Sequence, residues 1–217
     1  MGSVSTPPHR VVCGTAAVDD LDAFLASLDA IADGSGAVVQ AFDADLVVSD
    51  DHLRAATRLA ARAIARGEAV ARDPGVEILL YAAGRRQIDR ALAIGISEGE
   101  RRIAVLVADF GEVSGADRRP ADLDAAVASV EELLATAPTG GSVSTERAEG
   151  SASTERAEGS ASTASSEGSP KRRTSSTAFD EERVREFYGV SDRELAAVDG
   201  DLPDIVLERV ALLDVEK

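Results

Sequence analysis

The segment RIAVLVA, Arg102–Ala108, is the strongest strand signal in this sequence, and it decides the fold class. Its six consecutive apolar residues, Ile103–Ala108, are typical of a strand that is covered on both faces of a sheet. Two shorter segments, Arg10–Cys13 and Ala37–Phe42, are the other strands that we predict. Because so few strands are indicated, the sheet is expected to be small.

Helical spacing of apolar residues covers most of the remaining sequence. The clearest helix begins after Ser49, a good N-cap residue that is followed by Asp50 and Asp51, and it ends at Gly67. The other predicted helices lie at residues 20–34, 74–81, 87–94, 120–134, 180–188, 191–198 and 203–213. Helices that alternate with few strands predict an α/β (α+β) fold, in which several helices cover a small mixed β-sheet.

The middle of the chain has a different composition. Residues 141–178 carry five acidic and five basic side chains, and they include an exact repeat of STERAEGSA at Ser144–Ala152 and Ser153–Ala161. Units of this kind have little to bury and cannot offset the entropy cost of ordering the chain. They predict a flexible low-complexity insertion, after which the C-terminal helices pack back onto the fold.

This insertion divides the expected organisation of the chain. We expect residues 1–9 to be a disordered N-terminus and residues 10–140 and 179–217 to form one folded domain. Residues 1–140 have a net charge of −9 and residues 179–217 a net charge of −7.

The composition excludes several classes of protein. The chain has 217 residues and a net charge of −16, and only 2 of its 23 basic residues are lysines. Such acidity argues against a general nucleic-acid coat or a protein held on anionic lipid by charge. It is typical of halophilic proteins, although an acidic protein from a GC-rich mesophile is the alternative. No membrane span and no secretory signal are visible, so a cytoplasmic location is expected.

The sequence also lacks the usual motifs of catalysis. It has no phosphate-binding glycine loop, no HExxH, no G-x-S-x-G and no kinase signature. Cys13 is the only cysteine, so neither an internal disulfide nor a cysteine metal cluster is expected. We interpret His52 as a surface histidine in an acidic helix start, with a catalytic role as the alternative. The sequence therefore predicts a non-enzymatic protein without metal or cofactor.

Arginines gather in two places of this acidic sequence. Arg54, Arg58, Arg62 and Arg66 recur every four residues and form one stripe along a predicted helix. The stripe is either a solvated face balanced by acids elsewhere, or a contact for phosphates or an acidic partner subunit.

The second group of arginines lies in the segment EILLYAAGRRQI, residues 77–88. Gly84 ends a helix there and presents Arg85, Arg86 and Gln87 at a junction between two helices. Guanidinium planes, backbone amides and a glutamine side chain suit recognition of a phosphate or an unpaired base. The alternative is an ordinary glycine-terminated helix with exposed arginines.

The last predicted helix is apolar around nearly its whole circumference. Such a helix is either fully buried or shared between its own core and a partner. Its apolar positions are Ile205, Val206, Leu207, Val210, Leu212 and Leu213.

Four stretches, in order, resemble the small kinase-binding accessory subunit of the archaeal and eukaryotic KEOPS complex (the CGI-type kinase-binding protein family). VQAFDADLVVSDDHLRAA at Val39–Ala56 resembles the family's strand–turn–helix with its histidine. EILLYAAGRRQIDRAL at Glu77–Leu92 resembles its most characteristic motif, E-I-L-(hydrophobic)-x-A-(S/A)-G-x-x-Q-I. Phe187–Val190 followed by Leu195 resembles the penultimate helix, and VLERVALLDVEK at Val206–Lys217 resembles the C-terminal helix.

The resemblance implies a non-catalytic subunit of the machine that makes threonylcarbamoyladenosine in tRNA, from an archaeon and, given the composition, a haloarchaeon. It implies that the chain binds and regulates the small atypical kinase/ATPase of KEOPS, which in turn contacts the threonylcarbamoyl transferase. It further implies recruitment of tRNA through the single-stranded 3′ CCA end. A pure protein–protein adaptor that activates a kinase without binding RNA is the alternative.

The resemblance also assigns roles to individual residues. The apolar positions of the last helix are the candidates for the kinase contact, namely Ile205, Val206, Leu207, Val210, Leu212 and Leu213. The candidates for the tRNA contact are Gly84, Arg85, Arg86 and Gln87, with Tyr81, Arg54 and Arg58 as further candidates.

Overall fold

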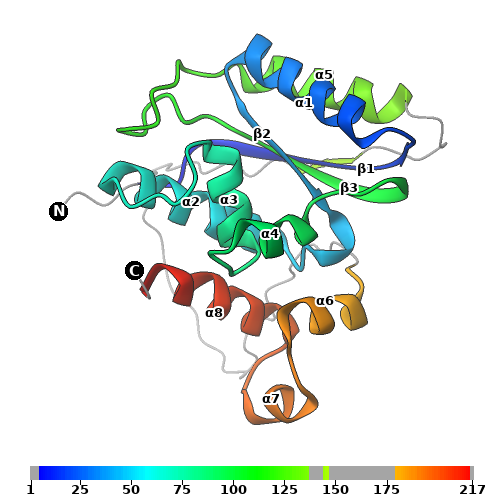
Figure 1. The fold of residues 1–217 in the computed structure, drawn as a ribbon, viewed down its shortest axis with the longest axis vertical. Helices are drawn as coiled ribbons and strands as arrows, with labels where there is room; N and C mark the ends of the chain where they lie inside the picture. The colour runs from blue at the N-terminus through cyan, green and yellow to red at the C-terminus, as the bar shows by residue number, and fades with distance from the viewer. Residues whose placement is uncertain (1–4, 137–143, 147–178, 216–217) are drawn as a thin grey trace, which may run out of the picture.

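A computed structural model describes residues 5–136, 144–146 and 179–215, and its strands form one antiparallel sheet (Figure 1). The strand order is β2-β3-β1-β4, with bounds β1 (His9–Val18), β2 (Val38–Asp43), β3 (Gly99–Ala108) and β4 (Ser144–Glu146). The α+β class is confirmed, but the sheet is antiparallel in every described pairing rather than mixed. The reason is that β3 lies between β1 and β2 and runs opposite to both.

Strand β3 is the centre of the fold, as its sequence predicts. All of its residues from Ile103 to Ala108 are buried, and the pleat sends alternate side chains into two separate core clusters. Leu106 joins the cluster on one face, whereas Val105 and Val107 join the cluster on the other. The sheet is therefore covered on both faces, which explains the unbroken apolar run.

Two helices cover one face of the sheet (Figure 1). These are α1 (Leu21–Ser35) and α5 (Leu123–Thr136), which pack Phe24 and Val130 against the sheet. The side chain of Asp20 caps the first turn of α1 by accepting a hydrogen bond from the Ala23 amide.

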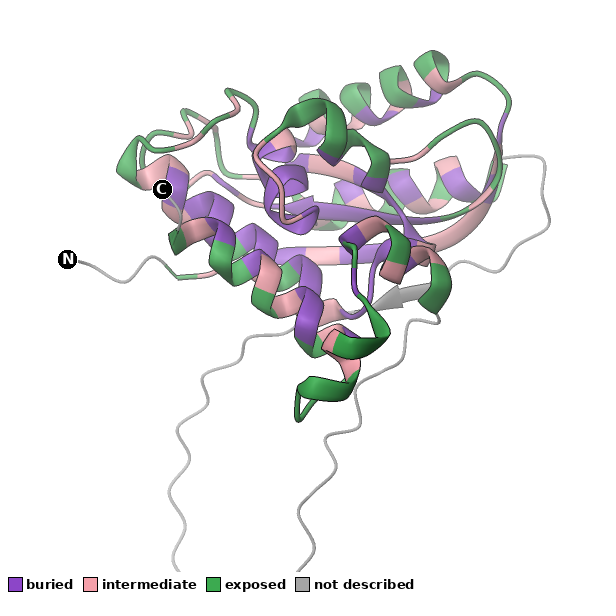
Figure 2. Ribbon diagram, turned by 60° about the horizontal axis from the view of Figure 1, so that its bottom comes forward, coloured by how far each residue is buried: buried purple, intermediate pink, exposed green. Residues whose placement is uncertain are grey.

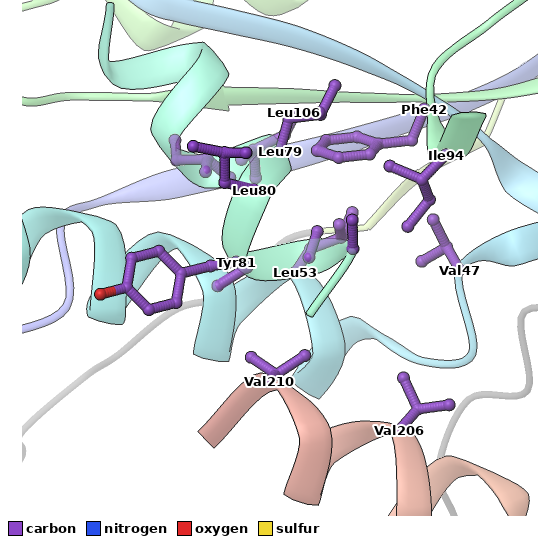
Figure 3. Close-up of a cluster of buried hydrophobic side chains, with 14 of the residues drawn as sticks. Phe42, Val47, Leu53, Leu79, Leu80, Tyr81, Ile94, Leu106, Val206 and Val210 are labelled. Carbon is purple, nitrogen blue, oxygen red and sulfur yellow. The ribbon is translucent and has the colours of Figure 1, made fainter. Parts of the chain in front are cut away.

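The other face is covered by two successive layers of helices. α2 (Asp50–Arg66) and α3 (Pro74–Ala82) lie next to the sheet, and α8 (Leu202–Val215) packs on α2 from the far side (Figure 1). Figure 3 shows Val206 and Val210 of α8 directed toward this core. The remaining short elements are η1 (Ala44–Leu46), α4 (Ile88–Ala91), η2 (Leu92–Ile94), α6 (Glu181–Tyr188) and α7 (Asp192–Ala197).

The predicted limits of the ordered chain need two corrections. His9 was expected to be disordered, but it begins β1 and is buried, with Nδ1 2.9 Å from the carbonyl oxygen of Pro7. Residues 144–146, in the first copy of the repeat, pair with β1 as strand β4. Residues 1–4 and the rest of the predicted insertion, apart from β4, lie outside the described residues.

Candidate partner-binding surface

Helix α8 carries the residues that we expected to contact a kinase, and the structure divides them between two faces. Four of the six are buried in the core of this chain, so their expected direct contact with a partner is wrong. These four are Ile205, Val206, Val210 and Leu213. They are buried because α8 packs on α2 and α3, which removes its inner face from solvent.

The opposite side of α8 is exposed, and we call Asp204, Glu208, Ala211, Leu212 and Val215 the α8 outer face. Leu212 is 47% exposed and Val215 is 76% exposed, and Leu207 lies half-buried at the margin of this face. Figure 2 shows buried and exposed positions together along the helix. The helix is therefore not fully buried, which was one of the two possibilities given above, because part of its apolar circumference is exposed.

Val215 is a surface residue that sequence reasoning missed. It lies three positions after Leu212, so the two side chains are neighbours on the surface of the helix. The last turn of α8 therefore presents an apolar pair, whereas the acidic side chains Asp204 and Glu208 lie nearer its start.

The end of α3 is closed by Gly84. The amide of Arg85 donates to the Leu80 carbonyl at 3.1 Å, and the amide of Gly84 donates to the Tyr81 carbonyl at 2.9 Å. These are the two hydrogen bonds of a Schellman motif, which places Gly84 in the left-handed region at φ 60°. Both backbone amides are therefore used by the helix end and are not displayed for a ligand.

Arg85 and Arg86 are half-buried and contact the C-terminal segment. Arg85 donates to the Phe187 carbonyl, and its guanidinium carbon lies 5.1 Å from the centre of the Phe187 ring. Arg86 donates to the carbonyl of Leu213 in α8 at 3.1 Å. Each arginine therefore has one contact within the chain and remains partly exposed, while Gln87, at the start of α4, is exposed.

Tyr81 is also a structural residue. It is only 1% exposed, and its hydroxyl donates to Oδ1 of Asp214 in α8 at 3.2 Å. Its expected contact with RNA is contradicted by this burial, because the ring has no surface to stack on a base.

The four arginines of the α2 stripe differ in their contacts. Arg54 pairs with Asp51 at 2.5 Å on the surface, and Arg62 reaches across to Asp214 of α8. Arg66 lies 3.9 Å from Glu68. Arg58 is exposed and has no ion pair among the described residues.

His52 is buried, and so the expectation of a surface histidine is wrong. Its Nε2 lies 2.9 Å from the carbonyl oxygen of Ala82, which can only accept, so the neutral ring carries its proton on Nε2. Burial lowers the pKa of His52 to about 4, and the ring is therefore neutral near pH 7. A neutral imidazole without access to solvent does not support the catalytic alternative.

Two polar contacts that sequence reasoning missed hold the motifs in place. The carboxylate of Glu77 is buried and accepts from the amides of Val70 and Ala71, both at 2.9 Å, which closes the loop between α2 and α3. Arg183 of α6 pairs with Asp43 at 2.6 Å and with Asp45 at 3.0 Å. No sequence motif signals either contact. Glu77 binds backbone amides of a loop, and Arg183 is about 140 residues away from its acidic partners.

The described residues contain no cluster of His, Cys, Asp and Glu that could hold a metal ion. Across the described part of the chain, no helix combines the length and the hydropathy that crossing a membrane requires.

The comparison with known protein families gives one match. Residues 24–214 match the family described as Kinase binding protein CGI-121. No individually curated protein matches the chain. The family match extends from within α1 to the last turn of α8, and it covers the first three stretches described above and the fourth as far as Asp214. The chain belongs to the CGI-121 family of kinase-binding proteins.

Proposed function

We propose that this chain is a non-catalytic accessory subunit that binds and regulates a small kinase/ATPase through the α8 outer face. The exposure of Leu212 and Val215 at the end of a helix whose other side is fixed in the core carries this proposal. Exposed apolar side chains that are neighbours on a rigid helix gain most when a partner removes them from water. Membership of a kinase-binding family supplies the class of partner.

The family resemblance of the four sequence stretches supports a finer proposal. In it, the kinase belongs to the KEOPS complex, the transferase is an indirect partner, and the chain recruits tRNA by its 3′ CCA end in the cytoplasm of a halophilic archaeon. The exposed polar side chains that remain for RNA are Gln87 and Arg90 near α4, and Arg58 on α2. With a net charge of −16, the contact would be local and would not depend on long-range attraction.

One observation favours the alternative of a pure protein adaptor. Arg85 and Arg86 were the main candidates for RNA, and both are engaged within the chain. An adaptor needs only the α8 outer face, so this function is compatible with every contact described above.

The kinase contact can be tested by measuring the affinity of the full chain for its cognate small kinase by calorimetry. Leu212→Glu and Val215→Glu place a charge in the proposed contact, and each should raise Kd by about a hundredfold or more. The matched control is Leu25→Glu, because Leu25 is 40% exposed on α1, on the other side of the sheet. Equal affinity for all three variants would refute the site.

The RNA contact needs a separate experiment. Gel shifts with intact tRNA and with tRNA that lacks its 3′ CCA should differ if the chain recruits this end. Gln87→Ala and Arg90→Gln should then weaken binding, whereas Arg193→Gln, an exposed arginine on α7, should not. Indifference of the affinity to the CCA end would favour the adaptor.

A further inference from the structure

We infer that Arg62, Tyr81 and Arg86 are positioning residues, which hold the last turn of α8 so that Leu212 and Val215 are presented to the kinase in one fixed orientation. This inference rests on the proposed function, since it concerns the same surface. In this role, Arg62 of α2 and Arg86 after α3 contribute to partner binding without contacting the partner.

The three side chains converge on two adjacent residues of α8. Arg62, from α2, pairs with Oδ2 of Asp214, and the Tyr81 hydroxyl, from α3, donates to Oδ1 of the same carboxylate at 3.2 Å. Arg86 donates to the Leu213 carbonyl at 3.1 Å. Both oxygens of Asp214 and the neighbouring backbone carbonyl are therefore held by elements other than α8.

The end of α8 needs such contacts because its own sequence stabilises it poorly. Carbonyl groups near the end of a helix depend on partners outside it, and the Leu213 carbonyl lies in the last described turn of α8, where no described residue of the helix supplies the amide four positions further on. The described last turn of α8 has no basic residue and contains the acidic Asp214. A negative charge at this end is repelled by the helix dipole, so the turn would fray on its own.

Arg62 and Arg86 supply the missing positive charge from outside the helix. Arg86 donates to a carbonyl of the last described turn, and Arg62 compensates the carboxylate of Asp214, whose side chain is only 7% exposed. Leu212 and Val215 flank these two held residues directly in the sequence. The contacts that order Leu213 and Asp214 therefore also order the helix turn that carries the two exposed apolar side chains.

Fixing this turn before binding has a predictable effect on affinity. A surface that is ordered in the free chain does not lose further conformational entropy when it docks, whereas a frayed turn must be ordered by the partner. Loss of the positioning contacts should therefore weaken kinase binding although the contact residues themselves are unchanged.

The test compares Arg62→Gln, Arg86→Gln and Tyr81→Phe with matched controls in the full chain. The controls are Arg72→Gln, in the loop between α2 and α3, and Arg193→Gln, on α7. Both alter exposed arginines that have no hydrogen bond or ion pair to α8 among the described residues. Each positioning variant should raise Kd for the cognate small kinase by about five- to tenfold, with a more unfavourable binding entropy. The controls should leave Kd unchanged.

Two further readouts separate positioning from a general loss of stability. In the positioning variants, hydrogen exchange should accelerate in the last turn of α8 and not in β3. The loss of kinase affinity that these variants cause should be smaller when Leu212 and Val215 are both replaced by alanine, because the ordered turn then carries no apolar contact residues. Tyr81→Phe removes a single hydroxyl and keeps the ring, so it retains the fold if an arginine variant does not.

The outcomes distinguish this inference from the proposed function. If the parent chain binds the kinase and Leu212→Glu abolishes binding, but the positioning variants bind like the controls, the inference is wrong and the function stands. If the positioning variants lose affinity for tRNA and keep that for the kinase, the arginines are RNA ligands and the inference is also wrong. If the parent chain does not bind the kinase, both fail together.

Discussion

Tyr188 and His52 share one hydrogen-bond acceptor, the carbonyl oxygen of Ala82. The Tyr188 hydroxyl donates to this oxygen at 2.8 Å and His52 Nε2 lies 2.9 Å from it, with 3.3 Å between the two side-chain atoms. The three residues come from α6, α2 and the end of α3, so one carbonyl joins the C-terminal segment to the helices that precede the predicted insertion.

The Tyr188 hydroxyl is expected to contribute to stability rather than to binding. Tyr188→Phe removes one buried hydrogen bond and should lower the free energy of unfolding by about 1 kcal/mol, since His52 still satisfies the Ala82 carbonyl. Denaturation by urea measures this change. An unchanged unfolding midpoint with an unchanged slope would show that the hydroxyl contributes nothing.

Acid should destabilise the protein through His52. Burial lowers the pKa of His52 from 6.5 to about 4 in the folded chain, whereas the unfolded chain keeps the ordinary value. Between these two values the unfolded chain binds a proton that the folded chain does not, so stability falls as the pH drops from 6.5 toward 4. The loss from this group is up to about 3 kcal/mol at pH 4.

The contribution of His52 is isolated by comparison with His52→Gln, which keeps a donor for Ala82 and does not titrate. The stability advantage of the parent chain over this variant should shrink as the pH falls from 7 to 4, as measured by denaturation at each pH. Burial also lowers the pKa of His9, so His9→Gln is the control that should retain most of the pH dependence of His52. Parallel pH profiles for the parent and His52→Gln would contradict the prediction.

The Glu77 carboxylate should be among the most sensitive polar groups of the fold. It is buried and accepts two backbone amides on one oxygen, Oε2, both at 2.9 Å, so Glu77→Gln replaces a charged acceptor by a weaker, neutral one. The free energy of unfolding should fall by about 2 kcal/mol.

Thermal unfolding of Glu77→Gln beside Glu112→Gln tests this point, because Glu112 is exposed and its replacement should have almost no effect. A similar Tm for the two variants would mean that the loop between α2 and α3 does not depend on Glu77.

Gly84 should be required for its backbone conformation and not for its size. At φ 60° any other residue is strained, but a Cβ atom there would have its nearest neighbour, Cβ of Arg209, at an ordinary 3.5 Å. Gly84→Ala should therefore cost about 1 kcal/mol. Gly34→Ala, inside α1 with no atom within 4 Å of the added Cβ, should be neutral or slightly stabilising, and calorimetry can compare the two.

Local signals in the sequence predict most of the secondary structure. Ser49 and Gly67 bound α2 as expected, with Ser49 accepting from the His52 amide and Gly67 in the left-handed region at φ 70°. The strand β3 was found from its apolar run alone. These predictions succeed because capping, helix termination and strand burial depend on residues that are close together in the sequence.

The candidate site was predicted less completely. The sequence singled out the last helix and the α3 corner, and it assigned Tyr81, Arg85 and Arg86 to RNA, whereas the structure engages them with the C-terminal segment. It also placed His52 at the surface. In each case the deciding partner lies more than 25 residues away in the sequence, and periodicity carries no information about it.

By itself, the sequence determined the acidic character of the chain, the order of its helices and of strands β1 to β3, and the family motifs. Only the tertiary structure decided which arginines are available and which face of α8 is exposed. The physical reason is that helical spacing determines the angle between side chains on one helix, whereas burial depends on where another element packs. For α8 that element is α2, and its contacts turn Val206 and Val210 inward and leave Leu212 and Val215 in solvent.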